Sequence, residues 1–188
     1  VAPGSYVKKA RVSSGATGVA TKKPEYILNL EASTVLKHIL EGKGYKVIMT
    51  RESHDVNISN SERAIFANNN KADMVVRVHA DSLNNPGKTG ASILIPAKES
   101  KYTTAIYEDS QSCANLISSK MKEAGIKVNG VFERGDLTGF NWSQVPVVLV
   151  EMGFLSNYTE DQMMSNPEYQ TKLMQAISDG LDEYFANK

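Results

Sequence analysis

Three residues of this chain have side chains suited to metal-assisted hydrolysis: Glu25, His79 and Glu151. A catalytic zinc ion takes about three protein ligands, commonly histidine and carboxylate, and keeps one position for water. The metal lowers the pKa of that water to about 7, and a free carboxylate nearby can carry the proton to the leaving group. These residues therefore suggest a metal-dependent hydrolase, provided that the fold brings them together.

Two of the three residues follow runs that are typical of buried strands. Residues 74–79 have the sequence Met-Val-Val-Arg-Val-His, and residues 145–151 have the sequence Val-Pro-Val-Val-Leu-Val-Glu. The apolar run before Glu151 predicts a strand that is buried on both faces and ends at Glu151, and the β-rich run 74–79 predicts a second strand that ends in His79. Ligands bind at the carboxyl edge of open α/β sheets, so we expect a shared cleft there.

Each of these residues also has a purely structural interpretation. Glu25 lies in the first turn of a helix that Pro24 begins, where the helix dipole favours a carboxylate without any metal. A histidine after a strand is commonly just hydrogen-bonded. Glu151 could form a buried ion pair with Arg77, which lies on the same strand face as His79. Spacing alone leaves both interpretations open.

Length and composition are those of an ordinary globular protein. The 188 residues fit one domain, 41% of them are hydrophobic, and 21 basic residues balance 21 acidic ones. The zero net charge gives no reason to expect nucleic acid or an anionic membrane as a partner. No apolar run reaches the roughly 20 residues that a membrane-spanning helix needs. We expect a monomer. Cys113 is the only cysteine, which excludes an internal disulfide, and we expect it in the core. The chain opens at Val1 without a signal peptide or an initiator methionine, so we expect a fragment or a processed form.

Predicted helices and strands alternate along the chain. We expect helices from Pro24 to Gly42, from Ser59 to about Asn70, from Tyr102 to Ala124 and from Asn166 onwards, and strands over 45–50, 74–79, 91–95, 126–131 and 145–150. Residues 1–23 are predicted to be an extended surface loop, and residues 81–90 and 132–144 are predicted loops. This order predicts a single three-layer α/β domain over 1–188, with a mainly parallel central sheet covered by helices on both faces.

The segment around Glu151 resembles a known family signature. Residues 146–157, Pro-Val-Val-Leu-Val-Glu-Met-Gly-Phe-Leu-Ser-Asn, are similar to the signature of zinc-dependent N-acetylmuramoyl-L-alanine amidases of the Amidase_3 type. Residues 72–81, Ala-Asp-Met-Val-Val-Arg-Val-His-Ala-Asp, and residues 25–30, Glu-Tyr-Ile-Leu-Asn-Leu, also resemble that family. Residues 44–51 and 61–63 are similar to the segments between them. The likeness runs in order from Glu25 to the last predicted helix.

The resemblance implies a role for each candidate residue. Glu25 and His79 would bind Zn2+, and Glu151 would be the catalytic carboxylate. The substrate would be peptidoglycan, cleaved at the amide between N-acetylmuramic acid and the L-alanine of the stem peptide, which implies an extracytoplasmic location in the cell wall or secreted. We assign substrate contact to Arg134, near Trp142, from its position before the Glu151 strand.

One feature of the family is missing from these residues. The family begins with a strand leading into an Asp-Pro-Gly-His turn that supplies another metal ligand, whereas this chain begins Val-Ala-Pro-Gly-Ser, and neither His38 nor His54 matches. We expect the ligand to lie upstream of Val1. The alternative is a catalytically inactive peptidoglycan-binding or regulatory relative that has lost the metal. A hydrolase of another amide is a third possibility, because the three residues do not specify the leaving group.

Overall fold

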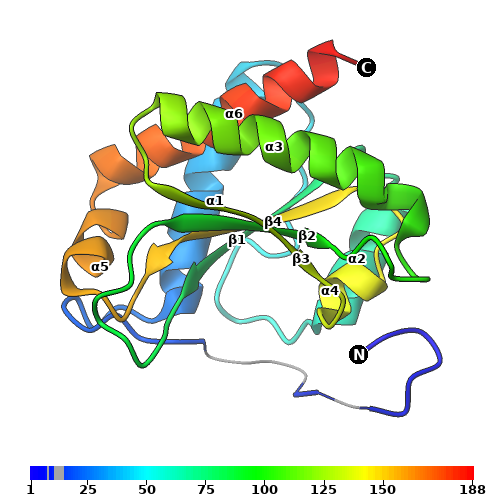
Figure 1. Ribbon diagram of the computed structural model, residues 1–188, viewed down its shortest axis with the longest axis horizontal. Helices are drawn as coiled ribbons and strands as arrows, with labels where there is room; N and C mark the ends of the chain where they lie inside the picture. Colours follow the sequence, from blue (N-terminus) through cyan, green and yellow to red (C-terminus); the bar gives the residue numbers. More distant parts are fainter. Residues whose placement is uncertain (8, 11–14) are drawn as a thin grey trace.

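The protein is built around a four-stranded sheet with the strand order β1-β4-β2-β3 (Figure 1). The computed structural model describes residues 1–7, 9–10 and 15–188. The strands are β1 (Val75–Asp81), β2 (Ala91–Pro96), β3 (Val128–Arg134) and β4 (Val147–Phe154). β1 pairs with β4 and β2 with β3 in parallel, whereas β2 and β4 are antiparallel. The predicted mainly parallel α/β sheet is therefore confirmed.

Helices lie on both sides of this sheet, which confirms the predicted layers. α1 (Glu25–Gly42), α3 (Tyr107–Glu123) and α6 (Pro167–Ala186) cover one face (Figure 1). α2 (Asn60–Asn69), the 3-10 helix η1 (Thr104–Ile106) and α4 (Thr138–Asn141) lie on the other side, and α5 (Tyr158–Met164) joins β4 to α6. Within the part of the chain that the structure describes, no helix is long and apolar enough to span a membrane.

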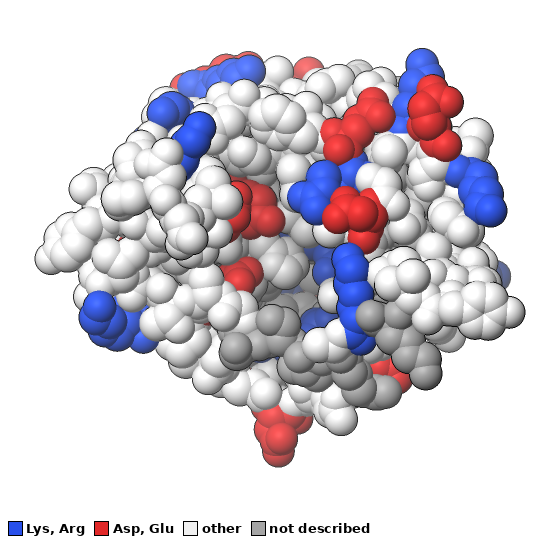
Figure 2. All heavy atoms as spheres, turned by 60° about the horizontal axis from the view of Figure 1, so that its bottom comes forward, with Lys and Arg blue, Asp and Glu red and all other residues white. Residues whose placement is uncertain are grey.

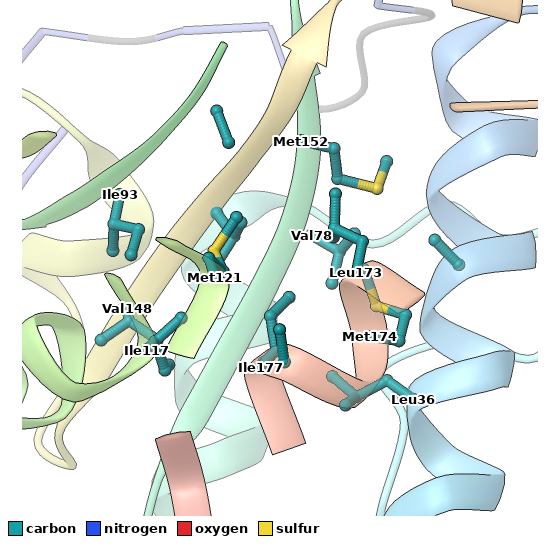
Figure 3. Packing of buried hydrophobic residues seen from close by; sticks show 14 of the residues in the cluster. Leu36, Val78, Ile93, Ile117, Met121, Val148, Met152, Leu173, Met174 and Ile177 are labelled. Atoms are coloured by element: carbon teal, nitrogen blue, oxygen red, sulfur yellow. The ribbon is translucent and has the colours of Figure 1, made fainter. Parts of the chain in front are cut away.

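Alternation along β4 divides the apolar side chains between two clusters. Val148, Val150 and Met152 point toward α1, α3 and α6 and join the main core (Figure 3). Val147 and Leu149 point the other way and form a smaller cluster with Ile106 and Phe140. Because this second cluster fills only part of its face, the rest of that face is left to polar side chains. Glu151 continues the same alternation and belongs to that polar part.

Local signals placed several element boundaries correctly. Ser59 accepts the Glu62 amide at 3.2 Å, and the Glu62 carboxylate accepts the Ser59 amide at 2.8 Å, so the predicted capping box begins α2. The Asn166 side chain caps α6 in front of Pro167, as expected. Cys113 is fully buried in the main core, and burial raises the pKa of its thiol to about 12, which agrees with a packing role.

Other boundaries were predicted wrongly. Residues 45–49 belong to no strand. Tyr45 and Val47 pack against the main core, but the segment has no hydrogen-bonded partner strand, so its alternating apolar residues reflect packing and not a strand. β4 does not end at Glu151, because the buried Phe154 continues its pairing with β1. The predicted loop 132–144 contains the end of β3 and all of α4.

Two helical regions also differ from the prediction. The helix expected from Tyr102 is a 3-10 turn followed by α3, and α5 was missed because it is only seven residues long. In the described part of residues 1–23 there is no helix or strand, only an isolated bridge between Thr17 and Pro24. Residues 8 and 11–14 of that segment lie outside the description.

Candidate functional site

His79 and Glu151 lie beside each other on adjacent strands. They are register partners in the parallel ladder of β1 and β4, so their side chains leave the same face of the sheet. That face is the one opposite α3 and α6. In Figure 2 this side of the molecule comes forward and is hollowed, with acidic and basic side chains around the depression. His79 and Glu151 therefore meet as predicted, but within the paired strands and not at their ends, since β1 continues to Asp81 and β4 to Phe154.

Glu25 joins them from the first turn of α1. Its Oε1 lies 3.0 Å from His79 Nδ1 and accepts the Ala80 amide at 3.4 Å. The structure thus brings a residue from the start of the first helix to the strand that carries His79, 54 positions later in the chain. Glu25, His79 and Glu151 converge as expected from the sequence.

The Glu25 carboxylate is held on both oxygens. Asn29 Nδ2 donates to Oε1 at 3.0 Å, and the Ala16 amide donates to Oε2 at 3.3 Å. Burial opposes ionisation of Glu25, but the hydrogen bonds from His79 and Asn29 outweigh it and lower the pKa of this carboxyl below its usual value. Glu25 is therefore an oriented anion, as a metal ligand must be. Asn29 was missed in the sequence, although its position one turn after Glu25 could have indicated the contact.

Glu151 has a different environment. Its Oε2 is buried and has no hydrogen-bond partner among the described residues. Burial raises the pKa of Glu151 to about 8, and the negative charges of Asp81 and Glu25 act in the same direction. The positive charges of Arg134 and Arg77 oppose this shift more weakly. A buried carboxyl with an unpaired oxygen and a raised pKa is typical of a group that moves a proton or contacts a ligand.

The ion pair that could have explained Glu151 structurally is not formed. Arg77 Nη2 donates to Asn60 Oδ1 at 2.6 Å, and the described residues contain no ion pair between Arg77 and Glu151. The guanidinium packs against Gly139, where a Cβ would overlap Nη1. Burial, followed by the charge of Arg63, lowers the pKa of Arg77 to about 10. Glu151 therefore keeps its free oxygen beside a buried cation that is bound elsewhere.

A cavity of about 540 Å³ begins at this site. Glu25 and His79 line one part of it, residues 75–78 of β1 and Gly139 line another, and the segment after α1 contributes Met49, Thr50, Arg51, His54, Val56 and Ile58. Three basic side chains, Arg51, Arg63 and Arg77, also line it. The site therefore has space for a ligand and a positively charged lining.

The donor set fits part of a zinc site. Glu25 Oε1 and His79 Nδ1 are close enough for one cation to replace their hydrogen bond and contact both atoms. No group of three or more histidine, cysteine or acidic residues suited to a metal occurs in residues 1–7, 9–10 and 15–188. His38 is exposed on α1, and His54 packs its ring on Tyr26, with centroids 5.3 Å apart. Neither histidine joins the pair, so a further donor has to come from elsewhere.

Arg134, to which we assigned substrate contact, lies at the end of β3. Its Nε and Nη2 donate to the two carboxylate oxygens of Asp136 at 2.7 and 2.8 Å. Arg134 is the register partner of Pro96, which shares a face of β2 with Ser92, the partner of Glu151, so Arg134 leaves the same side of the sheet as the site. Of the nearby aromatic residues, Phe140 is fully buried in the smaller cluster, whereas Trp142 is half-buried and its carbonyl accepts a hydrogen bond from the Asn68 side chain at 3.0 Å.

Comparisons with known proteins assign the chain to a family. The family described as N-acetylmuramoyl-L-alanine amidase matches residues 9–183. The chain is 28% identical over 166 residues to the probable cell wall amidase LytH of Staphylococcus saprophyticus, covering 88% of this chain and 51% of that protein. The chain therefore spans about half the length of that curated relative.

Solved structures share the fold. The amidase Ami1 of Mycobacterium abscessus has a TM-score of 0.86 and 26% identity, with 94% of this chain and 85% of that chain covered. The amidase Ami1 of Mycobacterium smegmatis, at 24% identity, has a TM-score of 0.87 and covers 96% and 85% of the two chains.

Proposed function

Because the chain belongs to the N-acetylmuramoyl-L-alanine amidase family, we propose that it is the catalytic region of a peptidoglycan hydrolase. The bond cleaved would be the amide between N-acetylmuramic acid and the L-alanine of the stem peptide. The observation that carries this proposal is the convergence of Glu25, His79 and Glu151, of which Glu25 and His79 line the cavity. The name of the LytH relative supports action outside the cytoplasm, at the cell wall.

We further propose that Glu25 and His79 are ligands of a zinc ion. Such an ion, when bound, polarises the scissile carbonyl and lowers the pKa of water. The Asn29 and Ala16 contacts support the assignment of Glu25, because they fix an ionised carboxylate in one orientation. A histidine upstream of Val1 as the further ligand remains a prediction.

Glu151 would move the proton. Its unpaired Oε2 accepts a proton from the attacking water and then delivers it to the departing amine. The two negative neighbours that raise its pKa favour the protonated form that this delivery needs. Arg134 would contact a carboxylate of the stem peptide from the rim, exchanging part of its bond with Asp136 for the substrate.

A second candidate is a peptidoglycan-binding relative without activity. The family match does not favour it over the enzyme, although the described residues supply only two of the usual ligands. Zinc stoichiometry of the complete gene product, together with release of stem peptides from purified wall, separates the two functions. The enzyme should bind zinc and release stem peptides, whereas zinc-free protein without release would establish the inactive relative.

The Glu151→Gln variant tests the catalytic assignment. It keeps the size of the side chain but cannot carry the proton, so the rate of stem-peptide release should fall by about a hundredfold or more while zinc remains bound.

A comparison of cell wall with small acyl-peptides as substrates tests which amide is cleaved. Equal cleavage of these and of cell wall would indicate a hydrolase of another amide.

A further inference from the structure

A buried carboxylate in α5 holds the segment that precedes Glu25. Asp161 is fully buried; its Oδ2 accepts the Ala20 and Thr21 amides at 2.7 and 2.8 Å, and its Oδ1 accepts the Thr21 hydroxyl at 2.8 Å. No basic side chain pairs with Asp161 in the described part of the chain. These three hydrogen bonds therefore compensate the buried charge, and breaking them would be costly.

The segment held by Asp161 is a compact turn, which we call the anchor turn (residues 16–24). At its base the Gly18 amide donates to the Lys23 carbonyl at 2.9 Å, and the Glu25 amide donates to the Ala16 carbonyl at 2.9 Å. The Ala16 amide in return donates to Glu25 Oε2. The base of the anchor turn thus contacts both the backbone and the carboxylate of Glu25, while its tip is bound to Asp161.

The fit between the anchor turn and α5 is close. A Cβ at Gly18 would overlap Asp161 Oδ1, so only glycine permits this approach. The Val19 amide also donates to the Leu155 carbonyl at 3.0 Å, just after β4. The segment that follows the Glu151 strand therefore determines where the anchor turn lies.

We propose that Asp161 is a positioning residue for the hydrolytic site. Through the anchor turn it fixes the direction in which Glu25 presents its carboxylate to His79. It touches neither substrate nor reacting atoms, and its effect is on the geometry of Glu25. The role of Glu25 as a ligand rests on the proposed function, whereas the coupling of Asp161 to Glu25 does not.

Amide hydrogen exchange in the 188-residue chain tests this coupling without any metal. In Asp161→Asn, exchange at Ala20 and Thr21 should accelerate about tenfold or more, and exchange at Ala16 and Glu25 should accelerate with it. Amides of α3 should keep their protection. Loss of protection at Ala20 and Thr21 alone, with Ala16 and Glu25 unchanged, would overturn the proposal.

A matched control is Asp182→Asn. Asp182 accepts the Tyr45 hydroxyl at 2.9 Å and pairs with Lys43, so it also anchors a loop, but far from Glu25. Its replacement should accelerate exchange around residues 43–45 and leave the anchor turn unaffected. If Asp161→Asn does not fold, Thr21→Val removes the hydrogen bond to Asp161 Oδ1 and the one that the Thr21 hydroxyl accepts from the Lys23 amide at 3.1 Å, and it should change the same four amides less.

Gly18→Ala tests the same coupling from the other side, since its Cβ displaces the turn and leaves the carboxylate intact. In the complete gene product, Gly18→Ala and Asp161→Asn should each weaken zinc binding about tenfold, and the double variant no further. Asp182→Asn should lower stability without changing zinc affinity. Unchanged zinc affinity in both anchor-turn variants would overturn the positioning role. A parent protein that binds no zinc would refute the proposed ligands, and the exchange data would then decide the coupling alone.

Discussion

Glu151 lies in surroundings that disfavour the negative charge of its carboxylate. Its pKa rises from an ordinary 4.5 to about 8, first through burial and then through Asp81 and Glu25. The folded metal-free protein therefore binds this proton more tightly than the unfolded chain does. Between about pH 4.5 and 8 the unfolded state gives up the proton first, so the free energy of unfolding falls as the pH rises.

The Glu151→Gln variant should lack this loss of stability. Relative to the variant, the metal-free parent should lose stability across that window, with a slope of at most about 1.4 kcal/mol per pH unit. Urea unfolding of both proteins in the presence of a chelator measures the difference between their free energies of unfolding at each pH. Contributions from the other titrating groups are the same in both proteins and cancel in this difference. Parallel pH profiles would show that Glu151 is ionised in the folded state throughout.

The site residues that could be predicted from the sequence are titratable residues next to apolar strands, where burial costs free energy unless the residue has a partner or a function. A carboxylate after the apolar run 147–150, and a histidine after the β-rich run 74–78, indicated a site before any fold was known. Asp161 could not be found in this way, because its importance comes from hydrogen bonds to the anchor turn, and contacts over 140 positions leave no local pattern. Asn29 lies only four positions from Glu25 and was missed because its residue type alone does not indicate a function.

At the scale of the elements, α3 and α6 cross so closely at Gly180 that there is no room for a methyl group at this position. A Cβ at Gly180 would lie 2.6 Å from Ile117 Cα and 2.8 Å from Ile117 N, and both are backbone atoms that cannot move aside alone. Helix propensity would favour alanine over glycine by about 1 kcal/mol. The steric cost of forcing the helices apart, about 1–3 kcal/mol, should exceed that gain.

Gly180→Ala should therefore destabilise the protein, despite improving the helix. Gly42→Ala is the matched control, since a Cβ there meets nothing within 4 Å and Gly42 also lies in a helix. Denaturant midpoints should fall for Gly180→Ala and rise or stay constant for Gly42→Ala. Equal midpoints for the two variants would mean that the α3–α6 contact adjusts freely.

Element types were more predictable than their pairing. The capping box of α2 and the Asn-Pro start of α6 depend on neighbours within four residues, so the sequence was sufficient for both. Whether an extended segment becomes a strand depends on a partner that is remote in sequence. Residues 45–49 have apolar alternation but no partner strand, whereas β4 gains Phe154 through pairing with Asp81. The antiparallel pairing of β2 with β4 likewise had no local signal.

At the scale of the whole molecule, the proposed zinc ligands join two elements that form different layers. Glu25 begins α1 and His79 lies in β1, so an ion bound to both would connect the helical layer to the sheet. A ligand that binds only the folded state stabilises it by about 2.7 kcal/mol at one hundred times its Kd. For a chain of this size each kcal/mol raises the Tm by about 2–4 °C.

The complete gene product should therefore unfold at a higher temperature with saturating zinc than with a chelator, by about 5–10 °C. His79→Ala removes one of the two bridging ligands and should abolish most of that shift, while His38→Ala, on the exposed side of α1, should retain it. Differential scanning calorimetry of the three proteins measures this. An equal zinc shift in the parent and in His79→Ala would show that the stabilising ion binds away from β1 and does not connect α1 to the sheet.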